Sequence, residues 1–115
     1  MVKKVSRTTL KHKADKLVSQ KVREIGRCEL EGKDHITCTG QLQTMHIVGR
    51  SNYRLRWDGQ NLLCGCSGHH MYYTNHPWDW NEFIKLMYPQ RYEYLNSERN
   101  KLWDKDYAKV LEEWK

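Results

Sequence analysis

The sequence lacks any run of about 18 apolar residues, the length that a membrane-spanning helix requires. Its N-terminus, MVKKVSRTTLKHK, also lacks the apolar stretch and the cleavage site of a secretory signal peptide. No internal repeat or low-complexity tract divides the 115 residues, so we expect one domain with no membrane partner. These absences favour the cytoplasm, where the four cysteines are expected to bind metal rather than to form disulfides.

Positive charge is concentrated near the N-terminus. Residues 1–27 hold nine Lys or Arg against two acidic residues, whereas the remainder is almost neutral and the formal total is +6. A basic arm on a near-neutral body suits a polyanion such as DNA, because each phosphate that is neutralised releases condensed counterions. On charge alone, a solvated helix face explains the same pattern equally well.

The periodicity of apolar residues predicts an α+β fold. Residues 8–25 are expected to form a basic amphipathic helix whose apolar stripe consists of Leu10, Ala14, Leu17, Val18, Val22 and Ile25. The other elements are expected as a loop at 27–40, a polar turn region at 49–58, short strands at 41–48 and 61–64, and helices at 69–76, 79–88 and 99–114. The chain is thus expected to have a basic helix at 1–26, a metal-bound core at 27–76 and a helical extension at 77–115, all within one domain.

Four residues have the chemistry and spacing of a structural zinc site. Two residues separate Cys66 from His69, a spacing that lets a tight turn point both side chains at one ion, and Cys28 and Cys38 supply the second pair. An all-cysteine set in which Cys64 replaces His69 remains an alternative. Nine residues separate Cys28 from Cys38, which is longer than the usual zinc knuckle. A small domain rich in loop gains folding free energy from metal, so we expect bound zinc rather than four free thiols.

A second group of residues points to chemistry. Adjacent side chains diverge by about 100° on a helix, so His70 must face away from an ion that His69 binds. His46 on the first strand and Asn61 on the second converge with His70 if the strands pair and the helix folds across them. Two imidazoles and an amide are the groups needed to activate water against a phosphodiester.

The stretch MHIVGRSNYRLRWDGQNLLCGCSGHHMYYTNHP, which begins at Met45, resembles an HNH endonuclease with a zinc-stapled ββα-metal, treble-clef-like core, particularly the small phage-encoded members. The resemblance covers about residues 27–96. It implies that His46 is the general base, that Asn61 holds the loop and the base in position, and that His70 binds a catalytic divalent metal such as Mg²⁺ or Mn²⁺. It also implies that Cys64 lies outside the zinc site.

Two departures from the family pattern affect the metal sites. Many members carry Asp or His just before the general base as a second metal ligand, whereas this chain has Met45, whose thioether binds hard ions poorly. The catalytic metal would then rest on His70, phosphate and water, or recruit Asp58 or His76 as a further ligand. The long interval between the first two cysteines also leaves room for His35 as a competing zinc ligand.

The expected function is a metal-dependent DNA endonuclease or nickase, which is a phosphodiester hydrolase; the alternative is a zinc-stabilised DNA-binding module without activity. Contacts with the DNA backbone are expected from Arg50, Arg54, Arg56, Lys11 and Lys13. A homodimer, or a partner in phage genome packaging or recombination, is compatible with the sequence. The location would be the host cytoplasm for a phage-encoded protein.

Overall fold

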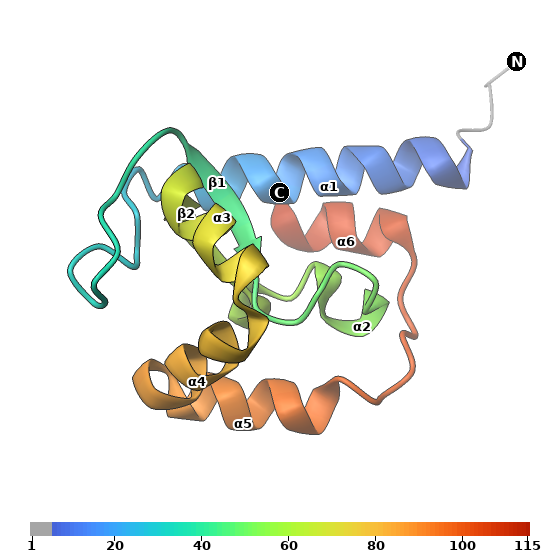
Figure 1. The fold of residues 1–115 in the computed structure, drawn as a ribbon. Helices are drawn as coiled ribbons and strands as arrows, with labels where there is room; N and C mark the ends of the chain where they lie inside the picture. Colours follow the sequence, from blue (N-terminus) through green and yellow to red (C-terminus); the bar gives the residue numbers. More distant parts are fainter. Residues whose placement is uncertain (1–5) are drawn as a thin grey trace, which may run out of the picture.

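The computed structural model describes residues 6–115, which form helices around a two-stranded antiparallel sheet. The elements are α1 (Arg7–Arg23), β1 (Leu42–His46), α2 (Tyr53–Arg56), the 3-10 helix η1 (Gly59–Asn61), β2 (Leu62–Cys66), α3 (Ser67–Asn75), α4 (Pro77–Met87), α5 (Pro89–Glu98) and α6 (Tyr107–Trp114). Figure 1 shows α1 beside α6 on one side of the sheet region, and α4 and α5 on the other. No helix in this part of the chain combines the length and apolar character needed to cross a bilayer.

The N-terminal helix is part of the core rather than a detached arm. Ser6 caps α1 by accepting a hydrogen bond from the Thr9 amide, and the predicted stripe buries Ala14, Val18 and Val22. Ile25, which we expected in this stripe, lies beyond the helix end and is 46% exposed. The α1-side core thus formed consists of Ala14, Val18, Val22, Trp57, Leu62, Cys64, Tyr107 and Val110.

The strands β1 and β2 occur where the sequence predicted them, but their boundaries differ. Met45 pairs with Leu63, and β2 continues to Cys66, two residues beyond the predicted end. Asn61 lies in η1 rather than on the second strand, because Asp58 caps this turn by accepting from the Gln60 amide. The α3-side core lies on the other face of the sheet and consists of Cys28, Leu30, Met45, Leu63, Cys66, Tyr73 and Ile84.

The C-terminal helices also differ from the prediction. Pro77, rather than the Asp79 box, opens α4, and Pro89 opens a helix, α5, that the sequence did not predict. Proline suits the first helical position, since it has no amide hydrogen to leave unpaired there. The predicted helix at 99–114 shortens to α6, which Asp106 caps by accepting from the Lys109 amide.

We expect Gly65 in β2 to tolerate no side chain. A Cβ there would overlap Met45 Sδ and lie 3.1 Å from Leu30 Cδ1, within the α3-side core. Gly65→Ala should therefore lower the free energy of unfolding by about 1–3 kcal/mol in urea titrations, as overpacking does. Gly49→Ala is the matched control, because a Cβ at Gly49 meets nothing within 4 Å. Equal stability of the two variants would contradict this packing.

Candidate metal centre and histidine cleft

The predicted zinc ligands come together at the junction of β2 and α3. The ligand atoms of Cys28, Cys38, Cys66 and His69 all lie within 4.8 Å of one another. His69 Nδ1 is 3.1 Å from Cys66 Sγ and 3.7 Å from the sulfurs of both Cys28 and Cys38. Tetrahedral zinc separates sulfur and nitrogen ligands by about 3.6 Å, so these four residues form a group that could hold a metal ion such as zinc.

Local backbone contacts explain this convergence. Cys66 ends β2 and caps α3, and its thiol accepts from the His69 amide at 3.4 Å. The Cys66 amide in turn donates to Cys28 Sγ at 3.3 Å. The loop that carries Cys38 is bound to the start of α3, because the Gly68 amide donates to the Thr39 carbonyl at 3.0 Å. The long interval between Cys28 and Cys38 therefore does not prevent their meeting.

Asp34 orients the His69 ring and was not anticipated from the sequence. Its carboxylate bonds His69 Nε2 at 2.9 Å and accepts from the Tyr73 hydroxyl at 2.7 Å. Burial alone would raise the pKa of Asp34, but the hydrogen bonds with Tyr73 and His69 outweigh it and hold the pKa below its usual value. A carboxylate on the outer nitrogen directs the other imidazole nitrogen toward a metal. An acid in a loop gives no local signal of this role.

The two alternative ligands lie outside this cluster. Cys64 packs in the α1-side core, where its thiol is fully buried and burial raises its pKa. His35 is exposed and its ring meets the edge of Tyr72, with centroids 5.8 Å apart.

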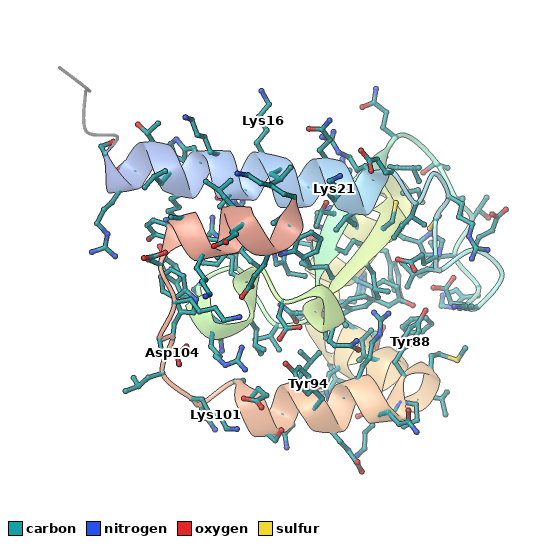
Figure 2. The ribbon with its side chains drawn as sticks, turned by 180° about the vertical axis from the view of Figure 1, so that it is seen from behind. Lys16, Lys21, Tyr88, Tyr94, Lys101 and Asp104 are labelled. Carbon is teal, nitrogen blue, oxygen red and sulfur yellow. The ribbon has the colours of Figure 1, made fainter. Side chains whose placement is uncertain are left out.

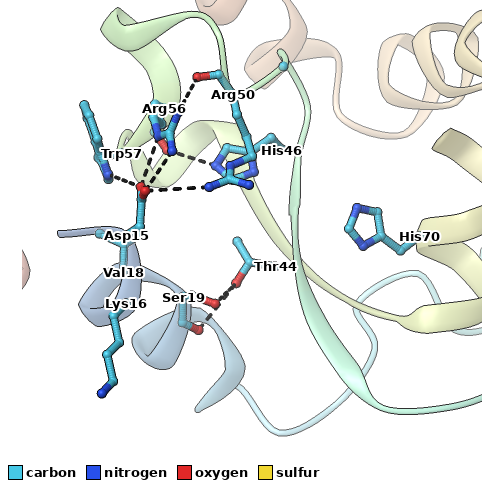
Figure 3. A pocket seen from close by; sticks show the side chains of 11 residues that line it. Asp15, Lys16, Val18, Ser19, Thr44, His46, Arg50, Arg56, Trp57 and His70 are labelled. Atoms are coloured by element: carbon cyan, nitrogen blue, oxygen red, sulfur yellow. Dashed lines mark hydrogen bonds and ion pairs between the residues drawn. The ribbon is translucent and has the colours of Figure 1, made fainter. Parts of the chain in front are cut away.

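A cleft of about 510 Å³ contains both His46 and His70. Its walls come from α1, the end of β1 and the loop before α2, and include Asp15, Lys16 and Arg50 (Figure 3). In this view His70 approaches from α3, across β1 from His46. The structure thus brings together two of the three predicted catalytic side chains with cationic residues around them.

His46 is held in one orientation by the backbone. Its Nε2 donates to the Arg56 carbonyl at 3.1 Å, which leaves the lone pair on Nδ1. Burial, reinforced by the charges of Arg50 and Arg56, lowers the pKa of His46 to about 4. The ring is consequently neutral at physiological pH and able to accept a proton.

His70 has one ring nitrogen bound and one available. Nδ1 donates to Gln43 Oε1 at 2.6 Å, so Nε2 carries the lone pair that a metal ligand needs. Burial lowers the pKa of His70, which favours this neutral form. Gln43 is a further site residue that sequence reasoning missed, since it sits on β1 with no motif around it.

Asn61 is fully buried and ties the loop between the strands together. Its Oδ1 accepts from the Val48 amide at 2.7 Å, and its Nδ2 donates to the carbonyls of Val48 at 2.9 Å and Leu55 at 3.0 Å. These bonds fix the segment that presents the Arg56 carbonyl to His46. Asn61 therefore acts on the backbone and does not reach the cleft surface.

The candidate metal ligands Asp58 and His76 lie apart from His70. Asp58 accepts from the Tyr94 hydroxyl of α5 and pairs with Arg54 at 3.7 Å. His76 stacks on Tyr72 and bonds the carbonyl of that residue at 2.7 Å. Neither residue lines the cleft.

The predicted phosphate-binding residues divide into free and engaged side chains. Arg56 is 8% exposed and forms a bidentate pair with Asp15, and Arg54 pairs with Glu98 at 3.1 Å. Lys11 donates to the Tyr53 hydroxyl at 2.6 Å. Lys13 is exposed and remains available to a phosphate, whereas Arg50 lies 3.6 Å from Asp15 Oδ2 but keeps a side chain that is 63% exposed and can still contact one.

We expect about one tightly bound zinc per chain, which Cys66→Ser should remove together with the fold. The reason is that Cys66 supplies both a thiolate and the cap of α3. Metal analysis of purified protein and circular dichroism measure the two losses. Cys64→Ser is the control, because Cys64 packs outside the cluster. Loss of zinc from Cys64→Ser with retention in Cys66→Ser would contradict the ligand set.

No protein-family model matches this chain, and no significant match is found among curated proteins or solved structures. The resemblance to HNH nucleases therefore stays a prediction. The function has to be argued from the residues of the cleft and of the metal centre.

Proposed function

We propose that this protein is a metal-dependent DNA endonuclease or nickase of the HNH type, in which β1, β2 and α3 form a zinc-stapled ββα-metal core. One observation carries the proposal: His46 and His70 line the same cleft, and each ring has one nitrogen with a free lone pair. In each ring the other nitrogen donates a hydrogen bond, which places the proton there. A proton acceptor and a metal-ligating imidazole beside cationic side chains are what phosphodiester hydrolysis requires.

The reaction would use His46 as general base. Nδ1 of His46 takes a proton from a water molecule as the water oxygen attacks phosphorus, and the bond to the 3′-oxygen breaks. The leaving oxygen takes a proton from solvent, which gives a 3′-hydroxyl and a 5′-phosphate. A divalent ion held by His70 would neutralise the scissile phosphate and stabilise the leaving oxygen.

The residues present fit a divalent ion only in part. His70 offers one imidazole nitrogen, whereas Asp58 and His76 are engaged elsewhere. Oxygens of the phosphate and of water would have to supply the remaining ligands, which hard ions such as Mg²⁺ accept readily. We therefore expect metal and DNA to bind together rather than independently.

Contacts with the DNA backbone are assigned to Arg50 and to the exposed lysines of α1. Lys16 contributes to the cleft wall and points away from the body of the protein in Figure 2. Asp15, the acidic residue within α1, is neutralised by Arg56, so the exposed face of the helix is cationic. Such contacts provide affinity without reading base sequence.

A zinc-stabilised DNA-binding module without activity is the second candidate. Among residues 6–115, the single cluster of three or more metal-ligating side chains is the one formed by Cys28, Cys38, Cys66 and His69. Met45, at the position before the proposed base, is buried in the α3-side core at 2% exposure. Both observations favour a protein without a complete catalytic metal site.

We expect the wild-type protein to nick supercoiled plasmid in Mg²⁺ or Mn²⁺ and to be inactive in EDTA. His46→Ala should lower the nicking rate by about 10²–10⁴-fold, the usual contribution of a general base. His70→Ala should shift the metal concentration needed for activity upward, because it removes the protein ligand. Gel assays of plasmid conversion measure both effects.

His35→Ala serves as the control, since His35 is exposed and lies outside the cleft. Binding of DNA without nicking in every metal would reject the enzyme and support the binding module. Nicking that survives His46→Ala at the wild-type rate would reject His46 as the base.

We expect two lysines of α1 to contribute to the salt dependence of DNA affinity. Because α1 supplies core residues, substitution tests its charges better than deletion does. Lys13→Gln with Lys16→Gln should reduce the slope of log affinity against log salt by up to about 2, since each neutralised phosphate contributes about 0.9 to that slope. Fluorescence anisotropy with a DNA duplex at several salt concentrations measures the slope.

The control pair, Lys85→Gln with Lys101→Gln, removes the same charge from α4 and from the segment just after α5, where Figure 2 labels Lys101. Its slope should stay at the wild-type value. An equal reduction of the slope in both double variants would assign the salt dependence to net charge and not to α1.

A further inference from the structure

Asp15 forms the centre of a polar network beside the proposed base. Arg56 Nε donates to Asp15 Oδ1 at 3.0 Å and Nη2 donates to Oδ2 at 2.7 Å, and Trp57 Nε1 donates to Oδ1 at 2.9 Å (Figure 3). The third guanidinium contact runs from Nη1 to the Arg50 carbonyl at 3.0 Å. Because Arg56 is 8% exposed, its planar group has little freedom to leave this arrangement.

The same residue, Arg56, presents its backbone carbonyl to His46. That carbonyl accepts from Nε2 of His46 at 3.1 Å. Asn61 fixes the preceding residue, since its amide donates to the Leu55 carbonyl at 3.0 Å. Two contacts thus hold the segment: Asn61 binds the backbone of Leu55, and Asp15 binds the side chain of Arg56.

We infer that Asp15 is a positioning residue for His46, acting through Arg56 to keep the imidazole as the Nε2–H tautomer with its lone pair on Nδ1. The contact joins residues far apart in the chain, so α1 becomes part of the site and not only a basic surface. This inference rests on the proposed role of His46 as general base.

The tautomer matters because a neutral imidazole carries a single N–H. With the proton on Nε2 the ring can accept a proton at Nδ1, and with the proton on Nδ1 it cannot. Burial, reinforced by Arg50 and Arg56, lowers the pKa of His46 to about 4, while the negative charge of Asp15 opposes this shift. Removing that charge lowers the pKa further, so the ring stays neutral near pH 7 and a change of tautomer can be observed separately from a change of protonation.

The experiment compares wild type, Asp15→Asn and Glu24→Gln by ¹⁵N NMR of the histidine rings without DNA. We expect His46 as the Nε2–H tautomer in wild type and as a mixture of tautomers in Asp15→Asn, because Arg56 loses its carboxylate partner. Glu24→Gln removes one negative charge from the exposed C-terminal cap of α1 and should leave the spectrum unchanged. In plasmid nicking, Asp15→Asn should lower kcat by about 10- to 100-fold, as misplaced reacting groups do, without raising KM, because the change removes a negative charge beside Arg50.

Retention of zinc and of the circular dichroism spectrum identifies a folded Asp15→Asn protein. If that variant does not fold, Asp15→Glu is tested instead. This change keeps a negative charge beside Arg56 but moves the carboxylate, so it should give a smaller shift in tautomer population. A folded variant with the wild-type tautomer and the wild-type kcat overturns the inference. A wild-type protein that never nicks DNA overturns the proposed function instead, and the NMR comparison still decides whether Asp15 positions the ring.

Discussion

The turn from β2 into α3 determines where His69 and His70 point. Cys66 ends the strand, caps the helix and offers its thiol to the cluster, so one residue sets the direction of the first helical turn. His69 then faces the three thiols and is fully buried, while His70, about 100° farther round the helix, faces the cleft. A metal bound at the cluster would fix this turn and, with it, the position of His70 relative to the strand that ends in His46.

The loop between the strands contains α2 and η1, and side chains support it in addition to its backbone hydrogen bonds. Asn61 and Asp15 provide this support: the amide of Asn61 binds backbone groups at Val48 and Leu55, and the carboxylate of Asp15 binds the side chain of Arg56. Buried polar groups of this kind stabilise a structure only when every partner is satisfied. Each here has its partners, so the loop can present one carbonyl to His46 without an unpaired group behind it.

Spacing and periodicity predicted the parts of the structure that depend on neighbouring residues. The pair Cys66 and His69, the two strands and α1 all follow from short-range patterns, and the structure brings the four predicted ligands together. The contacts of Asp34 with His69 and of Asp15 with Arg56 join residues 35 and 41 positions apart. Such pairs leave no local pattern, and the same holds for α5, whose apolar spacing is weak and whose start depends on reading Pro89 as a helix opener rather than as a stop.

The protonation state of His46 bears on the choice between an enzyme and a binding module. A module that only binds DNA gains affinity from positive charge, yet burial keeps this ring neutral and lowers its pKa to about 4. A neutral imidazole with its lone pair fixed on Nδ1 adds no attraction for phosphate, but it can take a proton from water. An anionic phosphate bound beside Arg50 would raise the pKa of His46 toward neutrality, since it offsets the nearby guanidinium charges. A general base at this position would thus become stronger when a phosphate is bound.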